Sequence, residues 1–395
     1  MKAVLRAFIY DFDLRTATEQ FQRLRNDWGM DGISLVAVSP ARVVLLPNAP
    51  GDRLRWIGEG TLCFQPHPAW YADLRFLPVF DEQAAKEEVF RRLVEAAKEA
   101  GLSVMAVVPC CQNSAIGRRY HDLTVLNALD DRIQDFLCPA NPDARTLMAA
   151  LVGDLCSNYA IDGVELESLG YLLLSRVQGL VSDIELTPAI EFLMSRCFCA
   201  HCTRAATERD IEIERVRFFA KTQLEQFFIA PTDFANTPLE WDIWASLVEG
   251  VGEQILYLRM AIVSSLLALL VEAAQKKDKK VHIEGHLLPA RLWTVGLDRQ
   301  QMVLLADAIE VDAKEVPPDR LPPSLILNKQ VVSTNAELWV RLHPSERFVA
   351  NRHAFLAQAK ACKDHNVSGV VFAGYGSLRR QNWSWIQEAV SLLKS

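Results

Sequence analysis

Residues 162–171 read Asp162-Gly163-Val164-Glu165-Leu166-Glu167-Ser168-Leu169-Gly170-Tyr171, a short apolar strand that ends in two glutamates. Side chains alternate along a strand, so Glu165 and Glu167 project to the same side. In a parallel α/β barrel the C-terminal strand ends line the mouth of the active site, where paired carboxylates suit proton transfer and oxocarbenium stabilisation in glycoside cleavage. The alternative is a pair neutralised by a neighbouring Arg or Lys. No basic residue lies between positions 162 and 175, which favours the functional interpretation.

The sequence on either side of this strand alternates regularly between strand and helix patterns. Eight short apolar runs are predicted to be strands: 4–10, 32–38, 103–108, 163–167, 280–286, 308–312, 338–342 and 369–372. Most are separated by amphipathic helical patterns, which predicts an α/β fold of the (β/α)8 TIM barrel type. We expect one barrel over residues 1–395, with a long loop insertion at 39–78 after the second strand and a helical insertion at 169–279 after the fourth. A proline-rich stretch at 316–323 is predicted to replace the helix after the sixth strand.

Composition narrows the range of functions. The 49 acidic and 42 basic residues give a formal charge of -7, and no basic run is long enough to suggest a nucleic-acid partner. The first residues lack the apolar core of a signal peptide, so we expect a cytoplasmic protein. The longest apolar stretch, 260–271, is too short to span a bilayer and is predicted to be a buried helix, with no membrane partner. The sequence leaves the oligomeric state open.

A cysteine-rich segment, Cys197-Phe198-Cys199-Ala200-His201-Cys202, is a candidate metal site. Three thiolates spaced Cys-x-Cys-x-x-Cys can wrap one zinc ion, and His201 or a distant residue could supply the fourth ligand. The alternatives are a metal-free thiol turn and a redox role. The chain has nine cysteines, an odd number that fits a disulfide framework poorly, and we expect them to be mostly reduced thiols.

Three segments together resemble a known group of proteins: 137–143 (Leu-Cys-Pro-Ala-Asn-Pro-Asp), 162–167 and 197–202. They look like a group of largely uncharacterised bacterial barrels that is similar to hypothetical glycosyl hydrolases near the α-amylase superfamily. Over nearly the whole chain the resemblance implies a barrel with its catalytic carboxylates on the fourth and fifth strands. The α-amylase-type nucleophile then falls on Glu167 and the general acid on Glu284. The arginine of that pattern falls on Glu165, which removes a cation that would keep the nucleophile ionised.

The fifth and sixth predicted strands carry further polar candidates. His282, Glu284 and His286 share one face by period two, so Glu284 could act as an acid, or His286 and Glu284 could hold a metal with a neighbouring acid. On the sixth strand Glu310 and Asp312 are also two residues apart. Asp312 could bind a sugar hydroxyl or stabilise the transition state, or else simply pair with Lys314 or Arg320.

Four more residues at predicted strand ends or in the following loops are candidate sugar-binding groups. Asp11 and Asp13 end the first strand, where they could hold hydroxyls or cap the next helix. His121 lies in the loop after the third strand, where it could bind substrate or be simply solvated. Tyr375 follows the eighth strand beside two glycines that would let the backbone approach a ligand.

The sequence therefore predicts a glycoside hydrolase-like enzyme acting on a small carbohydrate or sugar derivative. Glu167 is the candidate nucleophile or base and Glu284 the candidate acid, with Glu165, His286, Asp312, Asp11, Asp13, His121 and Tyr375 as candidate binding residues. This chemistry requires no cofactor, although a structural zinc is possible. Two alternatives remain open: a metal-dependent sugar isomerase, epimerase or lyase, and a catalytically degenerate carbohydrate-binding barrel.

Overall fold

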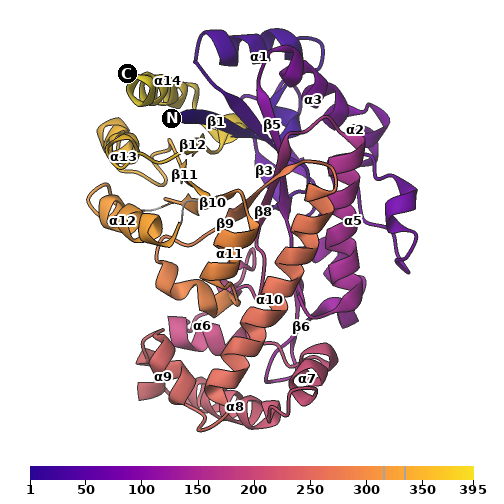
Figure 1. Ribbon diagram of the computed structural model, residues 1–395, viewed down its shortest axis with the longest axis vertical. Helices are drawn as coiled ribbons and strands as arrows, with labels where there is room; N and C mark the ends of the chain where they lie inside the picture. The colour runs from indigo at the N-terminus through magenta and orange to yellow at the C-terminus, as the bar shows by residue number, and fades with distance from the viewer. Residues whose placement is uncertain (315, 333–334) are drawn as a thin grey trace.

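A computed structural model describes residues 1–314, 316–332 and 335–395. Within them, eight parallel strands close a barrel in the order in which they occur along the chain, and β1 pairs with β12 to complete it (Figure 1). The strands are β1 Lys2–Ala7, β2 Gly32–Val36, β5 Ser103–Pro109, β8 Gly163–Glu167, β9 Lys280–Glu284, β10 Ala308–Asp312, β11 Glu337–Leu342 and β12 Gly369–Phe372. The predicted (β/α)8 barrel is confirmed.

The strands are almost wholly buried because helices cover the barrel on the outside and side chains fill it. The helices that follow successive strands are α1 Ala17–Asn26, α3 Val89–Glu99, α5 Pro142–Asn158, α10 Gly252–Gln275, α11 Arg299–Leu305, α12 Leu321–Val331, α13 Arg352–Asp364 and α14 Arg380–Lys394. Two short helices, α2 Glu82–Lys86 and α4 Ser114–Gly117, accompany them. The start of α5 follows from its sequence, because Asn141 caps the helix by accepting the Ala144 amide and Pro142 occupies the first turn.

The helix after the sixth strand corrects one prediction. The proline-rich stretch does not replace this helix, because α12 begins at Leu321 and carries Pro322 and Pro323 in its first turn. Amide groups of a first turn have no partner within the helix, so prolines there remove no helical hydrogen bond. Prolines predict a break only in the interior of a helix.

Other departures from the predicted boundaries affect the candidate site. The first strand ends at Ala7, and the next residues form a 3-10 turn, Ile9–Asp11, so Asp11 and Asp13 lie beyond the strand. The long segment 39–78 includes a two-stranded hairpin, β3 Val43–Leu45 with β4 Leu54–Trp56. A second hairpin, β6 Thr124–Leu126 with β7 Arg132–Leu137, follows β5.

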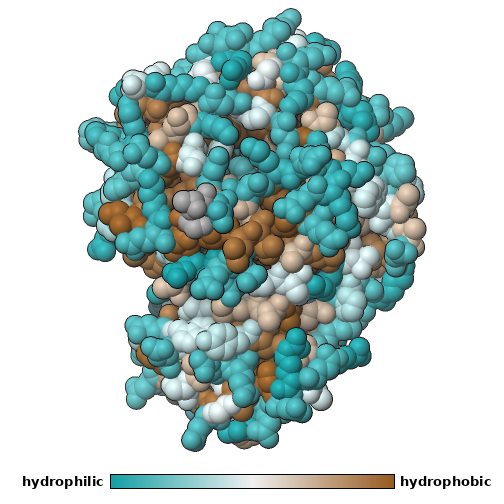
Figure 2. All heavy atoms as spheres, in the orientation of Figure 1, coloured by the Kyte–Doolittle hydropathy of each residue, from teal (hydrophilic) through white to brown (hydrophobic). Residues whose placement is uncertain are grey.

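The segment between β8 and β9 forms a helical layer at one end of the barrel, in the lower part of Figure 1. Its helices are α6 Pro188–Met194, α7 Ala200–Thr207, α8 Ile213–Ile229 and α9 Trp241–Ser246, before α10 returns to β9. By length and composition alone α10 could cross a membrane, with a mean hydropathy of 1.9 in its most apolar window. Half of that window is buried in the protein, where α10 packs against α5 and β9, the position of a core helix. Apolar side chains gather over the middle of this face (Figure 2).

Candidate active site

Glu167 ends β8 and is held by two arginines from other strands. Arg6 of β1 forms two parallel hydrogen bonds with its carboxylate, one of them 2.6 Å between Nη2 and Oε2. Arg341 of β11 forms an ion pair with the same Oε1 atom that accepts from Arg6. All three side chains are nearly buried. A carboxylate has about four lone-pair positions, so the two hydrogen bonds from Arg6 and the ion pair with Arg341 leave Glu167 a free position.

The two guanidinium groups decide the charge of Glu167. Burial by itself would raise the pKa of this carboxyl, but Arg341 and Arg6 outweigh burial and lower the pKa to about 2. Glu167 is therefore a carboxylate at neutral pH. The sequence pattern lacked a cation beside this residue on β8, and the structure supplies two from β1 and β11 instead.

Glu284 ends β9 close to Glu167. The backbone amide of Ser168, the residue after Glu167, donates to Glu284 Oε2 over 2.9 Å, and Arg176 pairs with Glu284 Oε1 at 3.0 Å. The Arg176 side chain is about half exposed, and its positive charge also acts on Glu167. One loop, which follows β8, thus links the two predicted catalytic carboxylates.

Ser168 adopts a left-handed backbone conformation, with φ of 51°, that is costly for a residue with a Cβ atom. The conformation directs its amide to Glu284 and its hydroxyl to Gln112, 3.1 Å away. Strained backbone of this kind concentrates at functional sites.

Asp312 ends β10 and makes polar contacts with β11 and the segment after it. His343 Nε2 lies 2.7 Å from Asp312 Oδ1, Arg341 Nη1 lies 3.6 Å from Oδ2, and the Lys314 amide donates to Oδ1. Burial opposes ionisation of Asp312, yet the hydrogen bond from His343 and the charge of Arg341 lower its pKa. The partners are therefore His343, Arg341 and a backbone amide, and not the side chains of Lys314 or Arg320.

A second polar group lies within the barrel interior. Ligand atoms of Glu165, His282 and Glu310 lie within 4.8 Å of one another, and all three residues are buried. Ser34 donates to Glu165, and Arg341 Nε donates to Glu310 over 2.6 Å. Burial, followed by the charge of Glu310, raises the pKa of Glu165 to about 8, and burial lowers the pKa of His282 to about 4. This group can hold a shared proton or a divalent cation.

The interior group differs from the metal site that the sequence suggested. β9 ends at Glu284, so His286 lies beyond the strand and its Nδ1 accepts the Leu288 amide over 2.9 Å. Glu284 pairs with Arg176. The histidine that lies close to two carboxylates is His282. It precedes Glu284 by two residues on β9 and therefore lies deeper in the barrel.

Cavities lie at both ends of the barrel. A pocket of about 180 Å³ is enclosed between the 168–176 loop and the 284–297 segment, and its wall includes Ser168, Arg176, Glu284, His286 and Arg291. A larger cavity, about 520 Å³, lies at the N-terminal strand ends and reaches Glu165 and His282. Active sites of these barrels form at the C-terminal ends, so the smaller pocket is the candidate active site.

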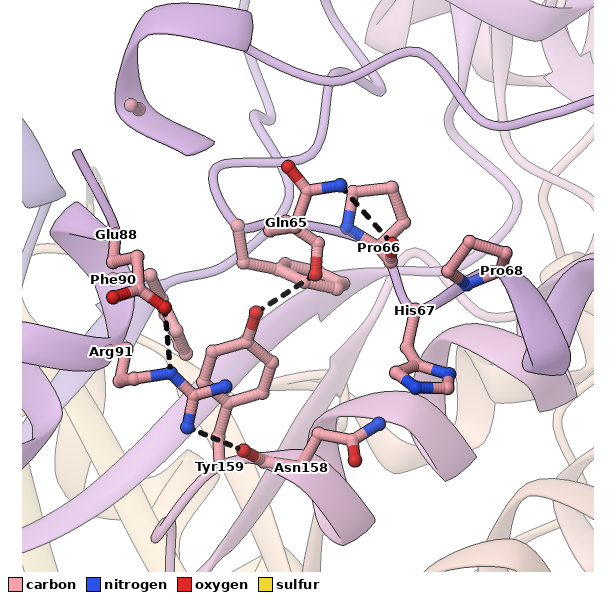
Figure 3. A pocket seen from close by; sticks show the side chains of 11 residues that line it. Gln65, Pro66, His67, Pro68, Glu88, Phe90, Arg91, Asn158 and Tyr159 are labelled. Carbon is pink, nitrogen blue, oxygen red and sulfur yellow. Dashed lines mark hydrogen bonds and ion pairs between the residues drawn. The ribbon is translucent and has the colours of Figure 1, made fainter. Parts of the chain in front are cut away.

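The pocket in Figure 3 lies away from the carboxylates. It is lined by Gln65, His67, Arg91, Asn158 and Tyr159, among others, and Tyr159 donates to the Gln65 carbonyl over 2.9 Å. Its side chains pair mainly with backbone carbonyls or with one another. None of the predicted site residues lines it.

Asp11, Asp13 and Tyr375 lie near the C-terminal end of β1. Asp11 is buried, accepts the Phe8 amide over 2.8 Å, and burial raises its pKa to about 7. Gly376 approaches Asp11 so closely that a Cβ atom would lie 1.7 Å from Asp11 Oδ1, so the glycine serves an internal contact. Asp13 pairs with Arg15, and Tyr375 stacks on Trp383 at 5.0 Å.

The remaining predicted residues, His121 and His201, lie apart from the barrel mouth. His121 is exposed and contacts Gln134 at 3.4 Å. His201 is half-buried on α7 and does not join the cysteine cluster, which brings Cys138 together with Cys197, Cys199 and Cys202. The fourth member of that cluster is the distant residue that the sequence left unspecified.

Sequence reasoning missed the cations of the site: Arg6, Arg341, Arg176 and His343. Arg6 and Arg341 each interrupt an apolar strand at a position that points inward, and this interruption was the available signal. Arg176 and His343 lie in loops, where a single charged residue carries little information.

No family model matches the sequence, and no curated protein matches it. Among solved structures, alpha-L-fucosidase isoenzyme 2 from Paenibacillus thiaminolyticus is 12% identical, has a TM-score of 0.60, and is matched over 100% of this chain and 49% of that chain. The PgaB (BpsB) glycoside hydrolase domain from Bordetella bronchiseptica is 13% identical, with a TM-score of 0.56 over 99% of both chains.

A beta-galactosidase from the haloarchaeon Halorubrum lacusprofundi is 12% identical, with a TM-score of 0.56 over 99% of this chain and 58% of that chain. This chain therefore spans about half of the fucosidase and a little more of the galactosidase, but nearly all of the PgaB domain. Likeness at this level of identity reflects the fold. The chain has the barrel architecture that these glycoside hydrolases share.

Proposed function

We propose that this protein is a glycoside hydrolase-like enzyme that acts on a small carbohydrate or sugar derivative. The observation that carries the proposal is the state of Glu167, a carboxylate at the C-terminal mouth of the barrel that Arg6 and Arg341 keep ionised. An ionised carboxylate can attack an anomeric carbon or activate a water molecule. The glycoside hydrolase architecture of the structural neighbours supports the same class of reaction.

Glu284 is the proposed proton donor to the glycosidic oxygen. It lies on the wall of the pocket and is tied to the residue after Glu167 through the Ser168 amide. Its other partner, Arg176, is half exposed and can leave when a sugar enters. Arg176, which also lines the pocket, then becomes available to bind sugar hydroxyls.

The pocket volume points to a small substrate. About 180 Å³ lies below the range of roughly 300–1,000 Å³ typical of pockets for larger ligands. Apolar side chains, including Leu172, Leu173 and Leu292, share the wall with the polar groups. Such a surface suits one sugar ring or a sugar with a short apolar substituent.

Metal-dependent sugar chemistry is the less supported function. Among the residues that the structure describes, the one buried set of carboxylates with a histidine is Glu165, His282 and Glu310, and it borders the cavity at the N-terminal strand ends through Glu165 and His282. A substrate in the pocket at the opposite end would be separated from it by the layer of Glu167, Arg6 and Arg341. His286 and Glu284 at the mouth have other partners.

A substrate screen with matched variants tests the proposal. Wild-type protein should hydrolyse at least one member of a panel of aryl glycosides of common monosaccharides, and Glu284→Gln should lose most of that activity. Glu272→Gln, an exposed change on α10 beside Lys276, should retain it. Absence of turnover on the whole panel, together with absence of saturable sugar binding by calorimetry, would contradict the proposal.

A further inference from the structure

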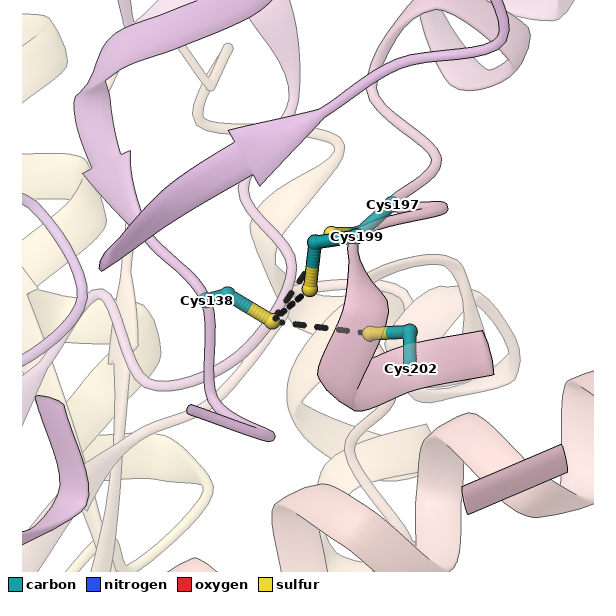
Figure 4. A group of neighbouring side chains, drawn as sticks. All are labelled: Cys138, Cys197, Cys199 and Cys202. Carbon is teal, nitrogen blue, oxygen red and sulfur yellow. Dashed lines mark hydrogen bonds between the residues drawn. The ribbon is translucent and has the colours of Figure 1, made fainter. Parts of the chain in front are cut away.

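Four buried cysteines from two distant segments meet in one place. Cys138 follows β7, Cys197 and Cys199 lie in the turn between α6 and α7, and Cys202 lies in the first turn of α7 (Figure 4). Cys138 Sγ lies 3.5 Å from the Sγ atoms of Cys199 and Cys202, and 3.7 Å from that of Cys197. All four sulfurs lie within 4.8 Å of one another.

These distances fit a tetrahedral thiolate site. Four sulfurs about 2.3 Å from a central zinc ion lie about 3.8 Å apart by tetrahedral geometry. A disulfide would bring two sulfurs to about 2.05 Å, which no pair in the cluster approaches. The mutual distances of the four sulfurs leave room for one ion at the centre of the group. Convergence of this kind is the feature of a closed metal site.

Groups around the sulfurs complement negative charge. The Tyr171 hydroxyl lies 3.3 Å from Cys202 Sγ, where it can donate to a thiolate. The Arg259 guanidinium stacks over the Tyr171 ring at 4.5 Å and is buried. Its Nη2 donates to the Thr294 carbonyl, but its Nε and Nη1 find no hydrogen-bond partner among the described residues. A zinc ion with four thiolates carries a net charge of −2, which this cation would offset.

We propose that Cys138, Cys197, Cys199 and Cys202 bind one zinc ion as a closed structural site, with Cys138 and not His201 as the fourth ligand. The four ligands leave no open coordination position, so the site takes no part in turnover. The ion links the α6–α7 turn and the start of α7 to residues 138–141, which precede α5. Tyr171, which contacts Cys202, belongs to the same loop as Ser168 and Arg176. The metal site therefore also stabilises the loop that forms one wall of the candidate active-site pocket.

Metal content under chelator challenge tests the assignment. Wild-type protein dialysed against EDTA should keep close to one zinc per chain by elemental analysis, and Cys138→Ser should lose most of it. His201→Ala should keep its zinc, and so should Cys362→Ser, which removes a buried thiol of α13 outside the cluster. Retention of zinc by Cys138→Ser, or its loss by His201→Ala, would overturn the assignment of the fourth ligand.

A second measurement covers the case in which Cys138→Ser fails to fold. X-ray absorption of the wild-type zinc protein should show four sulfur neighbours at about 2.3 Å and no nitrogen neighbour. Three sulfurs with one nitrogen, or a purified protein that holds no zinc and binds none after reduction, would refute the site. Neither result depends on glycosidase activity, so this inference stands or falls separately from the proposed function.

Discussion

Arg341 of β11 reaches across the barrel interior to pair with Glu167 of β8, and the same guanidinium also binds Glu310 of β10. The three strands are joined by a single buried cation. Glu167 has a second partner in Arg6, whereas Glu310 depends on Arg341. Burial raises the pKa of Glu310 despite the charge of Arg341, whereas Arg341 and Arg6 together outweigh burial and lower the pKa of Glu167.

Arg341→Gln should destabilise the protein strongly. The change leaves Glu310 without its buried cation, and breaking a buried ion pair from one side costs about 3–5 kcal/mol. Urea denaturation of the two proteins gives the difference in the free energy of unfolding. Arg23→Gln is the control, because Arg23 forms only an exposed pair with Asp27 and its loss should cost less than about 1 kcal/mol. Equal stabilities for the two variants would contradict the account.

Glu165 should make stability depend on pH. Its pKa is about 8 in the folded protein and about 4.3 in an unfolded chain, so the folded state holds a proton that the unfolded state releases. Its stabilising contribution is fully present below pH ~4.3 and is lost as the pH rises through about 8. Glu165→Gln mimics the protonated form, so the variant should lose less stability than wild type between pH 5.5 and 8.5. Parallel stability curves would show that Glu165 is ionised throughout.

Ser168 should tolerate glycine better than alanine. Both changes remove the hydroxyl that bonds Gln112, but only glycine relieves the left-handed backbone, by about 1 kcal/mol. The same pair of changes at Ser391, in the interior of α14, should show the reverse order, because glycine weakens a helix by about 1 kcal/mol relative to alanine. Thermal denaturation of the four variants measures both orders. Alanine as the better residue at both positions would argue against strain at Ser168.

The barrel was predictable because its signals are local. Each strand is a short apolar run, and residues 162–167 by themselves place Glu167 at the C-terminal end of a strand, with Glu165 two residues deeper in the barrel. The partners of those carboxylates were not predictable in this way. Arg6 and Arg341 lie 161 and 174 positions from Glu167, and only the closed barrel brings them together.

The same distinction holds for the cysteines. Three of them share a recognisable spacing, whereas Cys138 lies 59 positions before Cys197 and reaches the cluster only through the packing of the helical layer. His201 was a natural candidate by proximity in sequence, but it does not join the group that the four sulfurs form. Short-range patterns identify part of a site, and the fold supplies the remainder.

The most direct test of the proposed function is the turnover of Glu167→Gln on a glycoside that the wild-type protein hydrolyses, expressed per folded molecule. The variant leaves Arg6 and Arg341 without their carboxylate, so its folded fraction must be measured by circular dichroism at the assay temperature. The account predicts that the folded variant loses at least about 10³-fold in kcat, as expected for a group that acts in the transition state. Undiminished kcat in the folded fraction would remove Glu167 from the mechanism, and with it the central argument for glycoside cleavage.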